Sequence, residues 1–159
     1  GGRFCHVPGH PCAAAAIPGR VRETRPVPAS DRSAHAVGAA FAGAGVAHFA
    51  RPDFFESIVP RWMPSPRATN QISGAAEIVL GVAMMPRRTR RVAAFGLLGL
   101  LAAVFPANVD RYLNDVELRP DADGRMQRAE GADGVRTQNA VRLPFQLLFA
   151  WAVWRHTRR

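Results

Sequence analysis

A single carboxylate, Glu77, stands near the middle of an otherwise uncharged apolar segment that covers residues 68–86. An ionisable group inside such a segment is costly to bury, so it marks a functional position or a pairing position. Asn70, Ser73, Glu77 and Gly81 follow one another at three- and four-residue steps, which places them on one face of a helix. We expect this polar face to point into a bundle of helices.

Polar residues on other apolar segments are candidate partners for Glu77. In one interpretation Glu77, together with His48 or Arg142, binds a quinone headgroup, relays a proton or coordinates an ion. In the other, Glu77 is protonated or ion-paired, and polar contacts join the helices at about 0.6–2 kcal/mol each. We favour the second, because helix contacts explain every residue without a ligand. The expected intramembrane polar cluster consists of Glu77, Ser73, Asn70, His48, Asn108, Arg142 and Gln146.

The sequence offers little else that resembles a catalytic or metal site. Its two cysteines, Cys5 and Cys12, lie near His6 and His10, but the spacing is neither CxxC nor HxxxH and nothing downstream completes four ligands. The pattern also excludes a disulfide framework in the rest of the chain. We find no phosphate-binding loop and no nucleophile–base pair. We therefore assign no catalytic and no metal residue, and we favour a protein without catalytic activity of its own.

Four apolar segments, at 34–50, 68–86, 92–109 and 140–154, dominate the chain. The third has 18 residues without a charge and would reach roughly 27 Å as a helix, close to the thickness of a bilayer core. We expect an all-α bundle of four transmembrane helices in a domain at 34–159. Residues 1–33 are rich in Pro, Gly, Ala and Arg, which indicates a disordered basic tail or a mis-called start.

The charge pattern predicts an orientation in the membrane. The net charge is +9, and every basic residue is Arg, in short clusters between the apolar segments. This distribution argues against nucleic acid as a partner. Arg-rich connections favour the cytoplasmic side, and the longest cluster, Arg87–Arg91, separates two apolar segments. We expect a multi-pass protein of the inner membrane, with the lipid bilayer as its partner and both termini in the cytoplasm.

Several motifs in the same order resemble one known family. The stretch HFxxPxxFxxIVPxxxPxP at 48–66, the run SGxxEIxxG at 73–81, the PAN at 106–108 and the RLPxQ at 142–146 are similar to DoxX-like four-helix membrane proteins. The resemblance implies an inner-membrane protein, and some relatives are subunits of a thiosulfate:quinone oxidoreductase. It suggests quinone as a cofactor, but the matching region holds no cysteine, so we do not transfer the reaction.

Three classes of function follow from these observations. The first, which we favour, is an anchor or interaction subunit of a membrane complex, because no catalytic constellation is present. The second is a quinone-linked oxidoreductase subunit with a redox protein partner, supported by family analogy alone. The third is a small-solute or proton transporter that uses Glu77.

Overall fold

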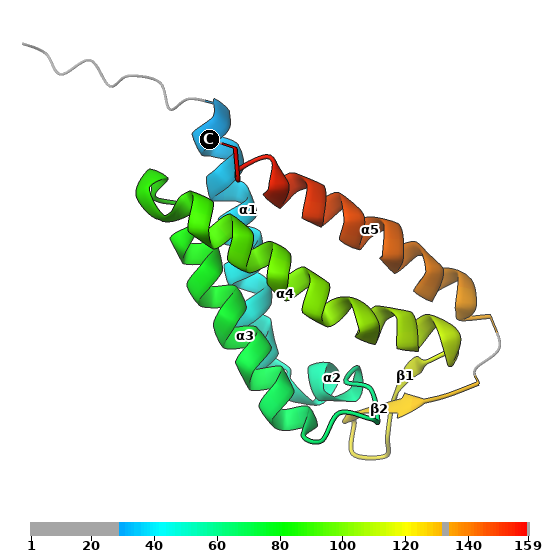
Figure 1. The fold of residues 1–159 in the computed structure, drawn as a ribbon. Helices are drawn as coiled ribbons and strands as arrows, with labels where there is room; N and C mark the ends of the chain where they lie inside the picture. The colour runs from blue at the N-terminus through cyan, green and yellow to red at the C-terminus, as the bar shows by residue number, and fades with distance from the viewer. Residues whose placement is uncertain (1–28, 132–133, 159) are drawn as a thin grey trace, which may run out of the picture.

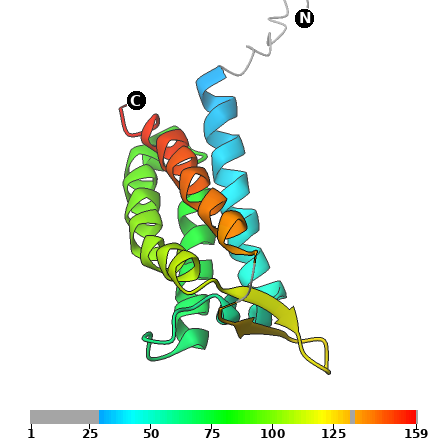
Figure 2. The ribbon, with the colours of Figure 1, turned by 90° about the vertical axis from the view of Figure 1, so that its right-hand side faces the viewer.

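The structure is a computed structural model that describes residues 29–131 and 134–158. Within these residues the chain folds into four long helices, one short helix and a two-stranded sheet (Figure 1). In both ribbon views the sheet lies at the end of the helices remote from the C-terminus (Figures 1 and 2). The elements are α1 (Ala29–Ala50), α2 (Pro52–Ser57), α3 (Pro66–Ala83), α4 (Arg87–Leu113), β1 (Glu117–Pro120), β2 (Met126–Ala129) and α5 (Arg136–Trp154).

Helices α1 and α3 pack closely because glycines face each other across their contact. A Cβ on Gly38 would lie 2.5 Å from the carbonyl oxygen of Gly81, and one on Gly45 would lie 2.5 Å from that of Gly74. All four glycines are buried. Small residues let two backbones approach in this way, and the close approach brings His48 on α1 next to the polar face of α3.

The apolar core lies at the end of the bundle where α3 turns into α4 and where α5 ends. The buried side chains there come from α1, α4, α5 and the turn, and α3 adds partly buried side chains. Phe41 on α1 meets Phe149 on α5 edge to face, with 6.1 Å between ring centroids. This core fixes α5 against the rest of the bundle. Its fully or nearly buried members are Phe41, Met84, Ala93, Ala94, Leu97 and Val153.

The arginine cluster expected to be a cytoplasmic loop is the first turn of α4. Asp31 on α1 accepts hydrogen bonds from Arg87 and Arg90, at 2.5 and 2.9 Å respectively. Hydrogen bonds from Arg87 and then from Arg90 lower the pKa of Asp31 to about 2. Arg90 is buried and also donates to the carbonyls of Met84 and Met85 at the end of α3. Two of the arginines therefore have structural partners.

The predicted bundle of four transmembrane helices is wrong. Among the described residues, only α4 is long and apolar enough to cross a membrane, and 17% of its most apolar 18-residue window is buried. The other long helices carry polar residues at intervals, such as Asp31 in α1, Asn70 and Glu77 in α3, and Arg142 and Gln146 in α5. The multi-pass placement in the inner membrane, with both termini in the cytoplasm, assumed four spans and is wrong for the same reason.

Two boundaries differ from those expected. Helix α1 begins at Ala29 rather than at residue 34, while the earlier part of the expected tail lies outside the described residues. Helix α4 continues past residue 109 to Leu113 and contains Pro106. Beyond it, β1 and β2 form an antiparallel hairpin that docks on α2, where Asp53 accepts a hydrogen bond from the Met126 amide at 3.1 Å.

Candidate functional site

A partly enclosed pocket lies between α1, α2, the segment after α2, α3 and α4. It has a volume of about 450 Å³, within the range of small-molecule sites, and apolar side chains form most of its wall. Polar groups enter from three helices. The lining residues are His48, Phe55, Ile58, Val59, Pro60, Trp62, Met63, Thr69, Asn70, Ile72, Ser73, Glu77, Leu100, Ala103, Val104, Ala107, Asn108 and Arg111.

Asn70 determines which ring nitrogen of neutral His48 carries the proton. The Asn70 amide nitrogen donates to the backbone carbonyl of His48 at 3.2 Å, so the amide oxygen must face the ring. That oxygen lies 2.7 Å from Nδ1 of His48, which therefore donates. Phe55 stacks on the same ring, with 3.8 Å between centroids. In neutral His48 the unprotonated nitrogen is consequently Nε2, whose lone pair is directed away from Asn70.

Glu77 lies on the other side of this ring. Its Oε2 is 3.6 Å from His48 Nε2, beyond hydrogen-bonding distance, and it has no hydrogen-bond partner within the described part of the chain. Burial raises the pKa of Glu77 to about 7. The protonated form of Glu77 therefore offers the pocket a donor, and the unprotonated Nε2 of neutral His48 offers it an acceptor.

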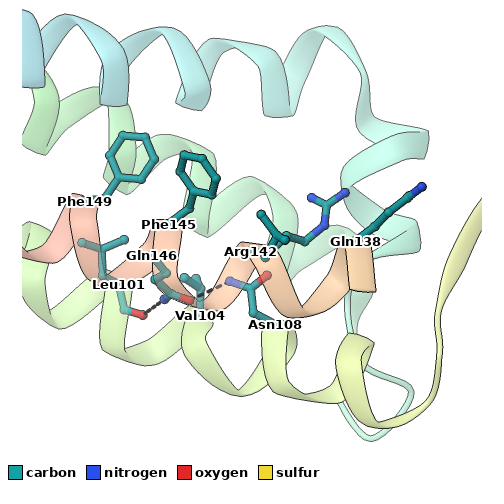
Figure 3. Close-up of a pocket in the computed structure, with 9 residues that line it drawn as sticks. Leu101, Val104, Asn108, Gln138, Arg142, Phe145, Gln146 and Phe149 are labelled. Carbon is teal, nitrogen blue, oxygen red and sulfur yellow. Dashed lines mark hydrogen bonds between the residues drawn. The ribbon is translucent and has the colours of Figure 1, made fainter. Parts of the chain in front are cut away.

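The remaining members of the expected cluster bridge α4 and α5. The Asn108 amide nitrogen donates to Gln146 Oε1 at 2.7 Å, and the Gln146 amide nitrogen donates to the carbonyl of Leu101 at 2.6 Å (Figure 3). Gln146 and Arg142 line a second, more open pocket of about 520 Å³ between these helices. Asn108 and Val104 line both pockets and form part of the wall between them.

The structure thus divides the predicted cluster between two neighbouring sites. Glu77, Ser73, Asn70, His48 and Asn108 line the pocket between α1 and α4. Arg142 and Gln146 line the pocket between α4 and α5, and Asn108 links the two through its hydrogen bond to Gln146. Of the candidate partners of Glu77 on the other segments, His48 is the one that the structure places beside its carboxylate. A functional role for the cluster stays a prediction.

Arg111 is a further polar residue of the first pocket that the sequence analysis did not single out. Only 4% of it is exposed, and its Nε has no hydrogen-bond partner in the described ranges. Burial, followed by the nearby charges of Arg142 and Arg128, lowers the pKa of Arg111 to about 10. The signal was present, because Arg111 lies three residues after Asn108 and shares its face if the helix continues.

No group of three or more His, Cys, Asp or Glu side chains in residues 29–131 and 134–158 is placed to hold a metal ion. Cys5, His6, His10 and Cys12, the residues examined for a metal site in the sequence, lie outside the described residues.

Residues 37–157 match the family described as a domain of unknown function (DUF8561), and the chain belongs to this family. The resemblance to DoxX-like proteins is therefore wrong as an identification, because its short motifs occur here within a different family. Quinone as a cofactor was suggested by that resemblance and loses this support. No curated protein and no solved structure matches the chain significantly.

Proposed function

We propose that this protein binds a small, largely apolar molecule in the pocket between α1 and α4. In this proposal Glu77 and His48 hydrogen-bond a polar group of that molecule. The supporting observation is Glu77 Oε2, a buried oxygen without a hydrogen-bond partner among the described residues, in a pocket with mainly apolar walls. Leaving a buried polar atom unsatisfied costs about 1–3 kcal/mol, and a ligand hydroxyl or amide would supply the missing partner.

The chemistry of the pair favours binding of a polar group over metal coordination. The protonated form of Glu77, which burial favours, donates, and the unprotonated Nε2 of neutral His48 accepts. A hydroxyl group, which both donates and accepts, matches this pair. The proton-relay role considered for Glu77 uses the same two atoms, so the pocket also offers a place for that step.

Decan-1-ol is a suitable first probe, because it joins a flexible apolar chain to one hydroxyl. We expect calorimetric titration to show binding to the wild-type protein. Ala103→Trp, which places a large ring in the lining, should abolish it. Glu77→Leu should weaken it about fivefold through the loss of roughly 1 kcal/mol of hydrogen bonding.

Ala102→Trp is the matched control, because Ala102 precedes Ala103 on α4 and is exposed outside the lining. It should bind decanol as the wild type does. If Ala103→Trp bound as tightly as Ala102→Trp, decanol would occupy another place and the proposed pocket would be wrong.

A second candidate function, an interaction subunit, is supported by exposed apolar side chains. Leu147, Trp151 and Trp154 are 66%, 52% and 43% exposed and share one face of α5. Exposed apolar side chains gathered on one helix face are typical of interaction sites. The predicted bilayer and redox-protein partners stay predictions.

Replacing Leu147 and Trp151 together by Glu tests this second candidate. We expect the wild-type chain to self-associate in light scattering or to float with phosphatidylcholine vesicles, and the double variant to do neither, because charge on the face opposes apolar contact. Gln138→Glu on the same helix is the control. A wild-type protein that is monomeric and does not float would contradict an apolar docking face.

A further inference from the structure

Arg111 differs from Arg90 and Arg128 because no carboxylate in the described part of the chain forms an ion pair with it. Arg90 lies 2.9 Å from Asp31, and Arg128 lies 2.5 Å from Asp110. Arg111 is as deeply buried as Arg90, yet its Nε has no hydrogen-bond partner and no carboxylate among the described residues pairs with its guanidinium. A guanidinium group in this position lacks the counter-ion that buried charges normally have.

The residues around Arg111 do not supply the missing counter-ion. The neighbouring charges of Arg142 and Arg128 are also positive, so they oppose the charge on Arg111. Arg111 lies in the last turn of α4, where the helix dipole favours a cation by about 0.3–1 kcal/mol. The cost of an uncompensated buried charge is several kcal/mol, which is clearly larger. The guanidinium therefore favours an anion from outside the described residues.

Arg111 also lines the pocket proposed above as a ligand site. Its fork of N–H donors matches the two oxygens of a carboxylate, with which arginine forms paired hydrogen bonds. The other walls of the pocket are formed mainly by side chains such as Phe55, Ile58 and Leu100, which suit an apolar body.

We infer that the ligand of this pocket is an amphipathic carboxylic acid, whose carboxylate pairs with Arg111 while its apolar body lies against the wall formed by α2, α3 and α4. This inference rests on the proposed function, because it specifies the ligand class of the same pocket. It assigns to Arg111 a direct role in ligand recognition.

Decanoate and decan-1-ol share a ten-carbon chain and differ in their polar group. Comparing them separates the proposed binding function from the inference that the ligand is a carboxylic acid. Titration at about pH 6 is appropriate, since Glu77 then retains its proton and does not repel a carboxylate. We expect wild-type protein to bind decanoate about tenfold or more tightly than decanol. Arg111→Gln should weaken decanoate about 10- to 100-fold and change decanol by less than about twofold.

Arg142→Gln is the matched control, because it removes the same charge from the neighbouring pocket and should retain the preference for decanoate. Equal affinity of wild-type protein for the two probes would overturn the inference and leave the proposed binding function standing. Failure of both probes to bind would overturn the two together.

Arg111→Lys keeps the test decisive if Arg111→Gln does not fold. Lysine retains the charge but loses the planar fork, so we expect decanoate to bind about three- to tenfold more weakly than to wild type and still more tightly than decanol. A lysine variant with unchanged decanoate affinity would contradict paired hydrogen bonding at Arg111.

Discussion

Glu77→Gln is expected to stabilise the protein by about 2 kcal/mol above neutral pH and to remove a fall in stability between about pH 4.5 and pH 7. Burial raises the pKa of Glu77 from 4.5 to about 7, so the folded state binds more protons than the unfolded state in this interval. The free energy of unfolding of the wild type therefore decreases as the pH rises from 4.5 towards 7. The full shift corresponds to roughly 3.4 kcal/mol, and residual solvent contact of the 16% exposed side chain reduces it.

Urea unfolding at a series of pH values measures this effect directly. Above about pH 7 the wild type buries a carboxylate that Gln replaces with a neutral amide of similar shape, so the two curves should separate there and converge near pH 4.5. Glu56→Gln is the control, because it removes a carboxylate outside the pocket and shows how the other titrating groups change the stability with pH. Parallel curves for wild type and Glu77→Gln would contradict the desolvation of Glu77.

Part of the candidate site could be predicted from spacing alone. Asn70, Ser73 and Glu77 repeat at helical intervals, and the structure places all three on the wall of one pocket. Which helices complete this wall was harder to predict, because it depends on the glycine contacts that join α1 to α3. That packing brings His48, rather than Arg142, to the carboxylate of Glu77.

The membrane interpretation was wrong because it used the average polarity of each segment. It did not take into account the ion pairs that charged side chains form with distant residues. Asp31, distant in sequence from α4, binds two of the arginines that were assigned to a cytoplasmic loop. The polar stretch between the third and fourth expected spans begins as the last turn of α4 and continues as a hairpin. The pair of Arg128 with Asp110 joins the hairpin to α4, and local sequence contains no sign of this long-range contact. Arg111 was missed because the helix was expected to end at residue 109, so its position one turn after Asn108 was not read as a shared face.

Gly81→Ala is expected to destabilise the protein by about 2 kcal/mol, although alanine favours helix formation. A Cβ at this position would lie 2.6 Å from the Ala42 amide nitrogen and 2.6 Å from the Gly38 carbonyl oxygen. Both are backbone atoms of α1, so no side-chain rotation relieves the contact and the two helices must separate. Overpacking of this kind typically costs about 1–3 kcal/mol, more than the gain of about 1 kcal/mol in helix propensity.

Gly43→Ala separates this packing effect from helix propensity. Gly43 lies on the exposed side of α1, where an added Cβ meets nothing within 4 Å, so this variant should be more stable than the wild type by about 0.5–1 kcal/mol. If the α1–α3 contact is close, urea unfolding should show a lower free energy of unfolding for Gly81→Ala and a higher one for Gly43→Ala. A stabilising Gly81→Ala would mean that the helices are further apart, and His48 would then lie too far from Asn70 and Glu77 for the proposed pocket to form.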